Sequence, residues 1–224
     1  DSGDTTTCNM RGNGDITLPP FTAHGNAVAT NLNPFNTNIN TVRGQETGYA
    51  TMNSEDSSGS GTLSDGNLKW HSAMASHMSV RSTLSMRTGK WYAEATVLDN
   101  ANTVGSAFGI ALNTANLDSY IGDTGGWSYH FNGNKYLNGD GGSSFGVAYG
   151  STKGNVVGLA LNADDGTLDA YLNGVYQGRV VDGLAEADYF WAANAFLCTW
   201  GFNFGQKPFK FPPPDGFQSL SAAA

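Results

Sequence analysis

The strongest constraint on the fold is a series of short apolar runs, separated by turn signals, that fills residues 78–204. In residues 78–86 apolar side chains recur at every second position, which is the period of a half-buried strand. Asn173-Gly174 is a residue pair favoured in type I′ hairpin turns. No window repeats apolar residues at the period of a helix. We therefore predict an all-β fold, an antiparallel β-sandwich or barrel with little helix.

The composition limits the partners that the chain can bind. Only 13% of the residues are charged, the net charge is −8 and the pI is about 4.7. The 11 lysines and arginines are scattered, whereas nucleic-acid binding needs clustered cations that neutralise phosphates. The same balance argues against binding to an anionic membrane surface. No apolar run reaches the ~18 residues of a membrane-spanning helix. We therefore expect neither a nucleic-acid partner nor membrane insertion.

The composition changes near residue 48. Residues 1–48 are rich in Asp, Ser, Gly, Thr and Asn and lack sustained alternation. We interpret them as an extended N-terminal arm or linker, and the alternative is a disordered tail. Residues 49–224 form the predicted sandwich. The chain begins with Asp1 rather than Met, which suggests a processed product or part of a longer chain.

The chain carries no recognisable metal or cofactor motif. Cys8 and Cys198 lie near opposite ends of the sequence, which leaves open whether they pair. The four histidines lack the spacing of a HExxH metal site. Asp118, Asp123 and Asp140 lie in glycine-rich loops whose oxygens could hold calcium, but they do not follow the EF-hand pattern. We interpret them as turn residues and predict no metal site and no cofactor.

Catalytic constellations are also missing from the sequence pattern. Asp164 and Asp165 are adjacent carboxylates, but they lie between two strand-like runs and are predicted to form a turn. The serines lack the GxSxG context of a nucleophile elbow. A glycosidase would need two carboxylates about 5–10 Å apart across a cleft. We predict that the chain is not an enzyme.

Three loops between the predicted strands carry the candidate ligand-binding residues. These residues are Asn100 and Asn102 in the first loop, Asp118, Tyr120 and Asp123 in the second, and Glu186 in the third. A tyrosine beside Asn and Asp side chains can stack on a sugar face and hydrogen-bond its hydroxyls, and the same set suits a protein epitope. The sequence therefore leaves open whether the ligand is a glycan or a protein. Trp127 alternates with Tyr129 and Phe131 and is predicted to lie in the core.

Three strings in the sequence resemble the SPRY/B30.2 family in order and in spacing. They are residues 89–94 (GKWYAE), 154–174 (GNVVGLALNADDGTLDAYLNG) and 203–217 (NFGQKPFKFPPPDGF). The resemblance implies an antiparallel, concanavalin-like SPRY β-sandwich. It also implies that the motif residues, Glu94 included, hold the fold rather than catalyse a reaction, and that recognition lies in the variable loops.

Residues 33–70 are similar to bacteriophage-encoded SPRY proteins, which are often tail or fibre components. This resemblance implies a non-catalytic virion protein, located outside the cell, that presents a recognition sandwich to a host-surface glycan or protein. The arm would then contact other virion proteins, and the sequence leaves open whether the chain forms a homo-oligomer. Two alternatives are a cellular SPRY adaptor that binds a peptide and a polysaccharide-active enzyme on a β-sandwich.

Overall fold

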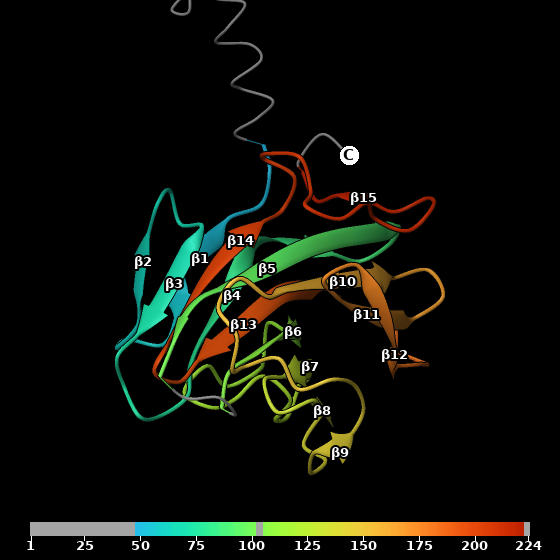
Figure 1. Ribbon diagram of the computed structural model, residues 1–224. Coiled ribbons are helices and arrows are strands. Elements are labelled where there is room, and N and C mark those ends of the chain that lie inside the picture. The colour runs from blue at the N-terminus through green and yellow to red at the C-terminus, as the bar shows by residue number, and fades with distance from the viewer. Residues whose placement is uncertain (1–47, 102–104, 222–224) are drawn as a thin grey trace, which may run out of the picture. The chain divides into compact units, whose positions relative to one another are not determined.

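The structure is a computed structural model that describes residues 48–101 and 105–221. In these ranges, fifteen strands form two sheets that pack face to face, which confirms the predicted all-β sandwich (Figure 1). The same ranges contain no helix, and therefore none long and apolar enough to cross a membrane. Most of the predicted arm, together with Cys8 and the candidate residue Asn102, lies outside the described residues.

Each sheet mixes strands from distant parts of the chain. The first sheet has the spatial order β1 (Met52–Ser57), β4 (Met78–Met86), β13 (Tyr189–Ala195), β6 (Ala107–Leu112), β7 (Gly126–His130), β8 (Asn134–Leu137) and β9 (Ser143–Ser144). The second has the order β12 (Val175–Val181), β11 (Thr167–Leu172), β10 (Val156–Asn162), β5 (Lys90–Asn100), β14 (Cys198–Asn203), β3 (Lys69–Ser72) and β2 (Thr62–Ser64). A short strand, β15 (Gln218–Ser219), adds to β5 in parallel, and the other pairs are antiparallel.

The core fills the space between the two sheets. Its largest fully buried side chains include Trp70, Trp191 and Trp200. Aromatic side chains of this size remove large apolar areas from water, and burial stabilises by roughly 25 cal/mol per Å². Trp127 is half-buried against this core, with its ring centroid 5.7 Å from that of Tyr189, so the predicted core position is confirmed.

The hairpin signals form the turns that they predict. Asn173 and Gly174 join β11 to β12 and both have positive φ, 51° and 82°, as a type I′ turn requires. Asp164 and Asp165 lie in the turn between β10 and β11. There the Asp164 carboxylate accepts the backbone N–H of Gly89 at 2.8 Å, which ties two turns together. The turn role predicted for these carboxylates is therefore confirmed.

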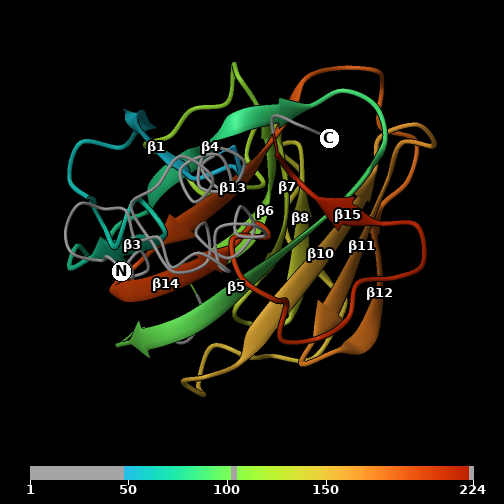
Figure 2. The same cartoon turned by 90° about the horizontal axis from the view of Figure 1, so that it is seen from above.

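A C-terminal strap, residues 205–217, crosses the outer face of the eight-stranded sheet (Figure 2). Beneath it lies Glu94 on β5, which is only 3% exposed. Its carboxylate accepts the backbone N–H groups of Lys210 at 2.8 Å and of Phe211 at 2.9 Å. Phe209 packs edge-on against Tyr92, with ring centroids 4.9 Å apart. Glu94 thus has the structural role that the family resemblance implied.

The two ends of the sandwich domain meet. Tyr49 and Ser221 pair in an isolated antiparallel bridge, and the N–H of Ala50 donates to the carbonyl of Leu220 at 3.0 Å. Cys198 lies at the start of β14 and is fully buried, which raises the pKa of its thiol to about 12. Because Cys8 is not among the described residues, a disulfide between the two cysteines stays an open question.

Candidate binding face

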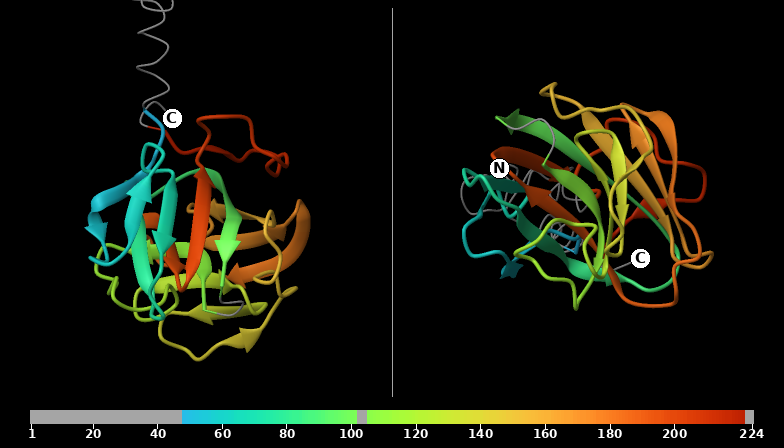
Figure 3. Two further views of the ribbon diagram at one scale, coloured as in Figure 1. Left: turned by 60° about the vertical axis from the view of Figure 1, so that its left-hand side comes forward. Right: turned by 90° about the horizontal axis from the view of Figure 1, so that it is seen from below.

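One long loop covers the outer face of the seven-stranded sheet, on the side opposite to the strap (Figure 3, right). We call residues 113–125, which join β6 to β7, the cover loop. The hydroxyl of Ser79 on β4 donates to the carbonyl of Ser119 at 2.6 Å. The side-chain oxygen of Asn194 on β13 accepts the N–H of Ile121 at 3.1 Å. Polar residues on the outer face of the sheet thus satisfy the backbone of the loop.

Arg81 on β4 fixes the start of the cover loop. Its guanidinium makes two 2.7 Å bonds to the Asp56 carboxylate on β1. It also donates to the carbonyls of Leu112 at 2.6 Å and Ala115 at 3.0 Å. The Arg81 side chain is 6% exposed and that of Asp56 31%. A planar guanidinium that satisfies four acceptors holds the loop in one position relative to the sheet.

His130 on β7 lies under the middle of the cover loop. It is 3% exposed, and its Nε2 lies 3.1 Å from the Ile121 carbonyl. Burial lowers the pKa of His130 to about 3, so the imidazole is neutral at physiological pH. Neutral Nε2–H can donate to that carbonyl, which makes His130 another anchor of the loop rather than a surface ligand.

The cover loop carries Tyr120 to an aromatic cluster. We use this term for His77, Tyr120, Tyr136 and Phe196. The Tyr120 ring lies 5.6 Å from that of His77 and 5.3 Å from that of Tyr136, and His77 lies 5.3 Å from Phe196. Burial raises the pKa of the Tyr120 hydroxyl and lowers that of His77. The half-buried rings form a rigid apolar surface with polar atoms at its margin.

Two predicted carboxylates lie on the same loop. Asp118 is exposed and accepts the hydroxyl of Ser58 at 2.9 Å. Asp123 accepts the hydroxyl of Ser119 at 2.7 Å, and this bond lowers the pKa of Asp123. Asp118, Tyr120 and Asp123 thus all lie on the cover loop, and their role in binding a ligand stays a prediction. Among the described residues there is no group of three or more His, Cys, Asp or Glu side chains that could hold a metal ion.

The other predicted residues do not join them. The side chain of Asn100, at the end of β5, donates to the carbonyl of Gly150 and holds a neighbouring loop. Glu186 forms an ion pair with Arg87 at 3.2 Å, just beyond the last residue of β4. The aromatic cluster lies at the first residue of that nine-residue strand, so about 25 Å separates the two positions. The third predicted loop therefore belongs to the opposite end of the sandwich.

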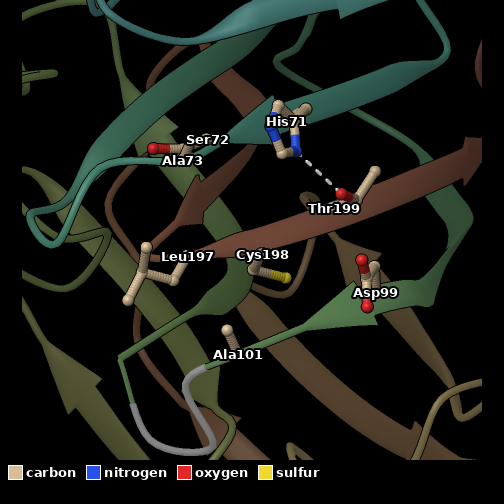
Figure 4. A pocket seen from close by; sticks show the side chains of 8 residues that line it. All are labelled: His71, Ser72, Ala73, Asp99, Ala101, Leu197, Cys198 and Thr199. Carbon is tan, nitrogen blue, oxygen red and sulfur yellow. Dashed lines mark hydrogen bonds between the residues drawn. The ribbon is translucent and has the colours of Figure 1, made fainter.

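β3, β5 and β13 all finish at the same end of the sandwich, and we call this end "the loop end". Beside the aromatic cluster it holds a cavity of about 200 Å³ (Figure 4). The cavity is lined by His71, Ser72, Ala73, Asp99, Ala101, Leu197, Cys198 and Thr199. On its rim, Nδ1 of His71 lies 2.9 Å from the hydroxyl of Thr199. Its lining comes from three strands and their connections, so no short sequence signal predicted it.

The turn between β13 and β14 forms one wall of the cavity. Leu197 in this turn has a φ of 54°, in the left-handed region. The other non-glycine residues with positive φ in the described ranges are all Asp or Asn, which tolerate that region more readily. The N–H of Leu197 donates to the carbonyl of Met74 at 3.1 Å, and the carbonyl of Leu197 accepts the N–H of Ala101 at 2.8 Å. These contacts with two neighbouring loops hold a strained backbone in place.

Comparisons with known proteins agree with this architecture. The SPRY domain of human HERC1 matches with a TM-score of 0.61 and 12% identity, over 70% of this chain and 99% of that domain. Stonustoxin matches with a TM-score of 0.53 and 18% identity, over 69% of this chain but only 27% of its own length. No family model matches the sequence. At these identities the matches show the fold: the chain is an antiparallel SPRY-like β-sandwich. Neither neighbour is a phage protein, so the phage resemblance stays a prediction.

Proposed function

We propose that this chain is a non-catalytic recognition module that binds a protein segment at the loop end. The observation that carries the proposal is the gathering there of the aromatic cluster, the cavity and Met74, which is 45% exposed. Protein interfaces are enriched in aromatic side chains and methionine, and their strongest contacts fill pockets. The anchored backbone lowers the ordering cost of binding.

Three reactive groups of the domain support a non-catalytic role, because their surroundings give them a structural use or a low reactivity. Glu94 is occupied by the strap, and Asp123 is bound within its own loop. The thiol of Cys198 has a raised pKa and is therefore a poor nucleophile at neutral pH. A polysaccharide-active enzyme would instead need two free carboxylates that converge across a cleft.

The test is a selection of peptides from a displayed random library on the purified full chain, followed by affinity measurement. Met74→Ser and Tyr120→Ala should each weaken the selected peptides by about tenfold or more, as central interface residues do. Tyr176→Ala is the matched control, because Tyr176 is 54% exposed on the edge strand β12. Thermal melts confirm that each variant folds. Equal affinity of all variants, or no selected peptide, would contradict the proposal.

We further propose a virion setting, in which the module recognises a host-surface protein or glycan and residues 1–48 contact other virion proteins. The support is the similarity of residues 33–70 to phage-encoded SPRY proteins, together with the low charge of the chain. Mass spectrometry of purified particles should detect the chain, and the purified protein should bind intact host cells. Absence from particles would favour the cellular adaptor instead. A glycan array run beside the peptide selection decides between the two ligand classes.

A further inference from the structure

We infer that the cavity at the loop end accepts a basic side chain, an arginine or a lysine, of the bound protein segment. This inference rests on the proposed function and names the chemistry recognised at one point of that site. It follows from the shape of the lining, the position of one carboxylate and the charge of the surrounding surface.

The lining suits the aliphatic stem of a long side chain. Ala73, Ala101 and Leu197 supply apolar walls, and Cys198 lies fully buried among the residues that line the cavity (Figure 4). Arginine and lysine bury their methylene groups along such surfaces and keep the charged head at the margin. A short polar side chain would leave these walls in contact with water, and an apolar side chain would make no bond to the carboxylate at the rim.

The charged rim is the carboxylate of Asp99. One of its oxygens, Oδ1, contacts Nζ of Lys153 at 2.5 Å and the N–H of Asn100 at 2.9 Å. Among the described residues no hydrogen bond or ion pair to the other oxygen, Oδ2, is found, although the carboxylate also interacts electrostatically with His71 on the rim. The hydrogen bond from Lys153 lowers the pKa of Asp99, so the group is ionised at neutral pH. Oδ2 can therefore receive a cation that enters the cavity.

Lys153 does not close the site. The side chains of Lys153 and Asp99 are each 62% exposed, and an ion pair of this kind is worth little in water. An incoming guanidinium or ammonium can share the carboxylate or replace the lysine. The net charge of the chain, −8, also favours a cation as the ligand.

The wall of the cavity that contains Leu197 is already formed before a ligand binds. The backbone of Leu197 is fixed on both sides by Met74 and Ala101 in a conformation that leucine rarely adopts. A site that is pre-organised in this way loses little conformational freedom on binding. Even a single capped amino acid should therefore bind measurably, without the rest of a partner.

The experiment is an NMR titration of the full chain with N-acetyl methylamides of arginine, lysine, norleucine and glutamate. Arginine and lysine should shift the amide signals of His71, Leu197 and Thr199 with dissociation constants in the millimolar range. Norleucine should bind about two- to threefold more weakly, as expected for the loss of one exposed ion pair, and glutamate more weakly still.

Two variants should move the affinity for the capped arginine in opposite directions. Asp99→Asn should weaken the affinity for the capped arginine about two- to threefold, as expected for an exposed ion pair, and bring it to the level of norleucine. Lys153→Gln should strengthen it about two- to threefold, because a competing cation is removed. The matched controls are Asp182→Asn and Lys90→Gln, two exposed positions away from the loop end. Equal binding of glutamate, or an unchanged affinity in Asp99→Asn, would overturn the inference.

The inference and the proposed function can fail separately. Selected peptides could lose affinity in Met74→Ser but keep the same affinity in Asp99→Asn. The proposed binding module would then stand, and the inference of a pocket for a basic side chain would be wrong. If no peptide binds while capped arginine still occupies the cavity, the proposed function fails and the chemistry of the cavity survives. Support for both requires selected peptides that carry a basic residue whose replacement by norleucine matches the effect of Asp99→Asn.

Discussion

The two outer faces of the sandwich are covered in different ways. On the eight-stranded sheet, the strap is held by the buried carboxylate of Glu94, by the side chain of Asn203, which donates to the Pro208 carbonyl at 3.2 Å, and by aromatic packing. On the seven-stranded sheet, the cover loop is held by many polar side chains of the sheet itself, among them Arg81 and Asn194. The strap has one buried charged anchor, whereas the anchors of the cover loop are spread over β4, β7 and β13.

This difference separates stability from recognition. The strap lies on the side of the molecule away from the cover loop and carries none of the candidate ligand residues. The cover loop positions Tyr120 in the aromatic cluster, so the network beneath it also builds the binding face. We therefore expect damage to the strap to affect folding alone, and damage to the network to affect folding and binding together.

The largest effect is expected at Glu94, the charged anchor of the strap. Glu94→Ala removes a buried acceptor and leaves two N–H groups of the strap unpaired, which should cost about 4 kcal/mol of unfolding free energy. Urea denaturation measures the loss, and Glu186→Ala is the control for an exposed glutamate. If the comparison holds, the folded fraction of Glu94→Ala still binds selected peptides with unchanged affinity. A weakened affinity would mean that the two covers are coupled.

A variant that disrupts the polar network under the cover loop should lose somewhat less stability than Glu94→Ala, but it should clearly lose affinity for peptides. Arg81→Met leaves the Asp56 carboxylate without its guanidinium, and breaking such a pair costs about 3 kcal/mol. Arg87→Met is the matched control, since Arg87 also forms two ion pairs but is 52% exposed, and it should cost under about 1 kcal/mol. Peptide affinity should fall only in Arg81→Met. Similar stability of the two variants would show that Arg81 is no anchor.

Acidification tests the network in the wild-type chain. His130 has a folded-state pKa of about 3, below its unfolded value near 6.5. The unfolded state therefore binds the proton more tightly, and the stability that neutral His130 provides is complete above pH 6.5 and is lost as the pH falls towards 3. Between pH 7.5 and 5.5 the loss should be about 1 kcal/mol. His130→Gln should remove most of this dependence, and an equal slope in both proteins would assign it to other groups.

The smallest effect is expected at the strained turn. Leu197→Asn places a residue that tolerates positive φ at the wall of the cavity, and should raise stability by about 0.5 kcal/mol. The same change removes an apolar wall, so binding of capped arginine should weaken. Thermal denaturation and the NMR titration measure the two effects. A gain in stability without any loss of binding would show that the strain has no role in recognition.

Most of the fold could be predicted from the sequence, because its signals are local. The two-residue period of β4, the Asn173-Gly174 turn and the strings around Glu94 act within single strands or hairpins. The grouping of Asp118, Tyr120 and Asp123 was equally accessible, since they share one loop.

The cavity and the anchors of the cover loop could not be predicted in the same way. His71 and Thr199 meet only because β3 pairs with β14, across more than a hundred residues of sequence. His130 and Arg81 are polar residues on strands, a pattern that usually indicates a solvent-facing side. Their burial depends on a loop that comes from elsewhere in the chain. The position of Glu186 could not be predicted for a related reason, since the residues of a loop do not reveal at which end of a sandwich the loop lies.

The bridge between Tyr49 and Ser221 has an architectural consequence. These two residues lie side by side, and β15, just before Ser221, pairs with the start of β5. The other end of β5 reaches the loop end, about 30 Å away along a strand that rises by ~3.3 Å per residue. The domain is therefore suited to circular permutation and to insertion into a loop of a host protein, because its entry and exit points coincide. Inserted in this way, the domain would hold its loop end away from the host protein.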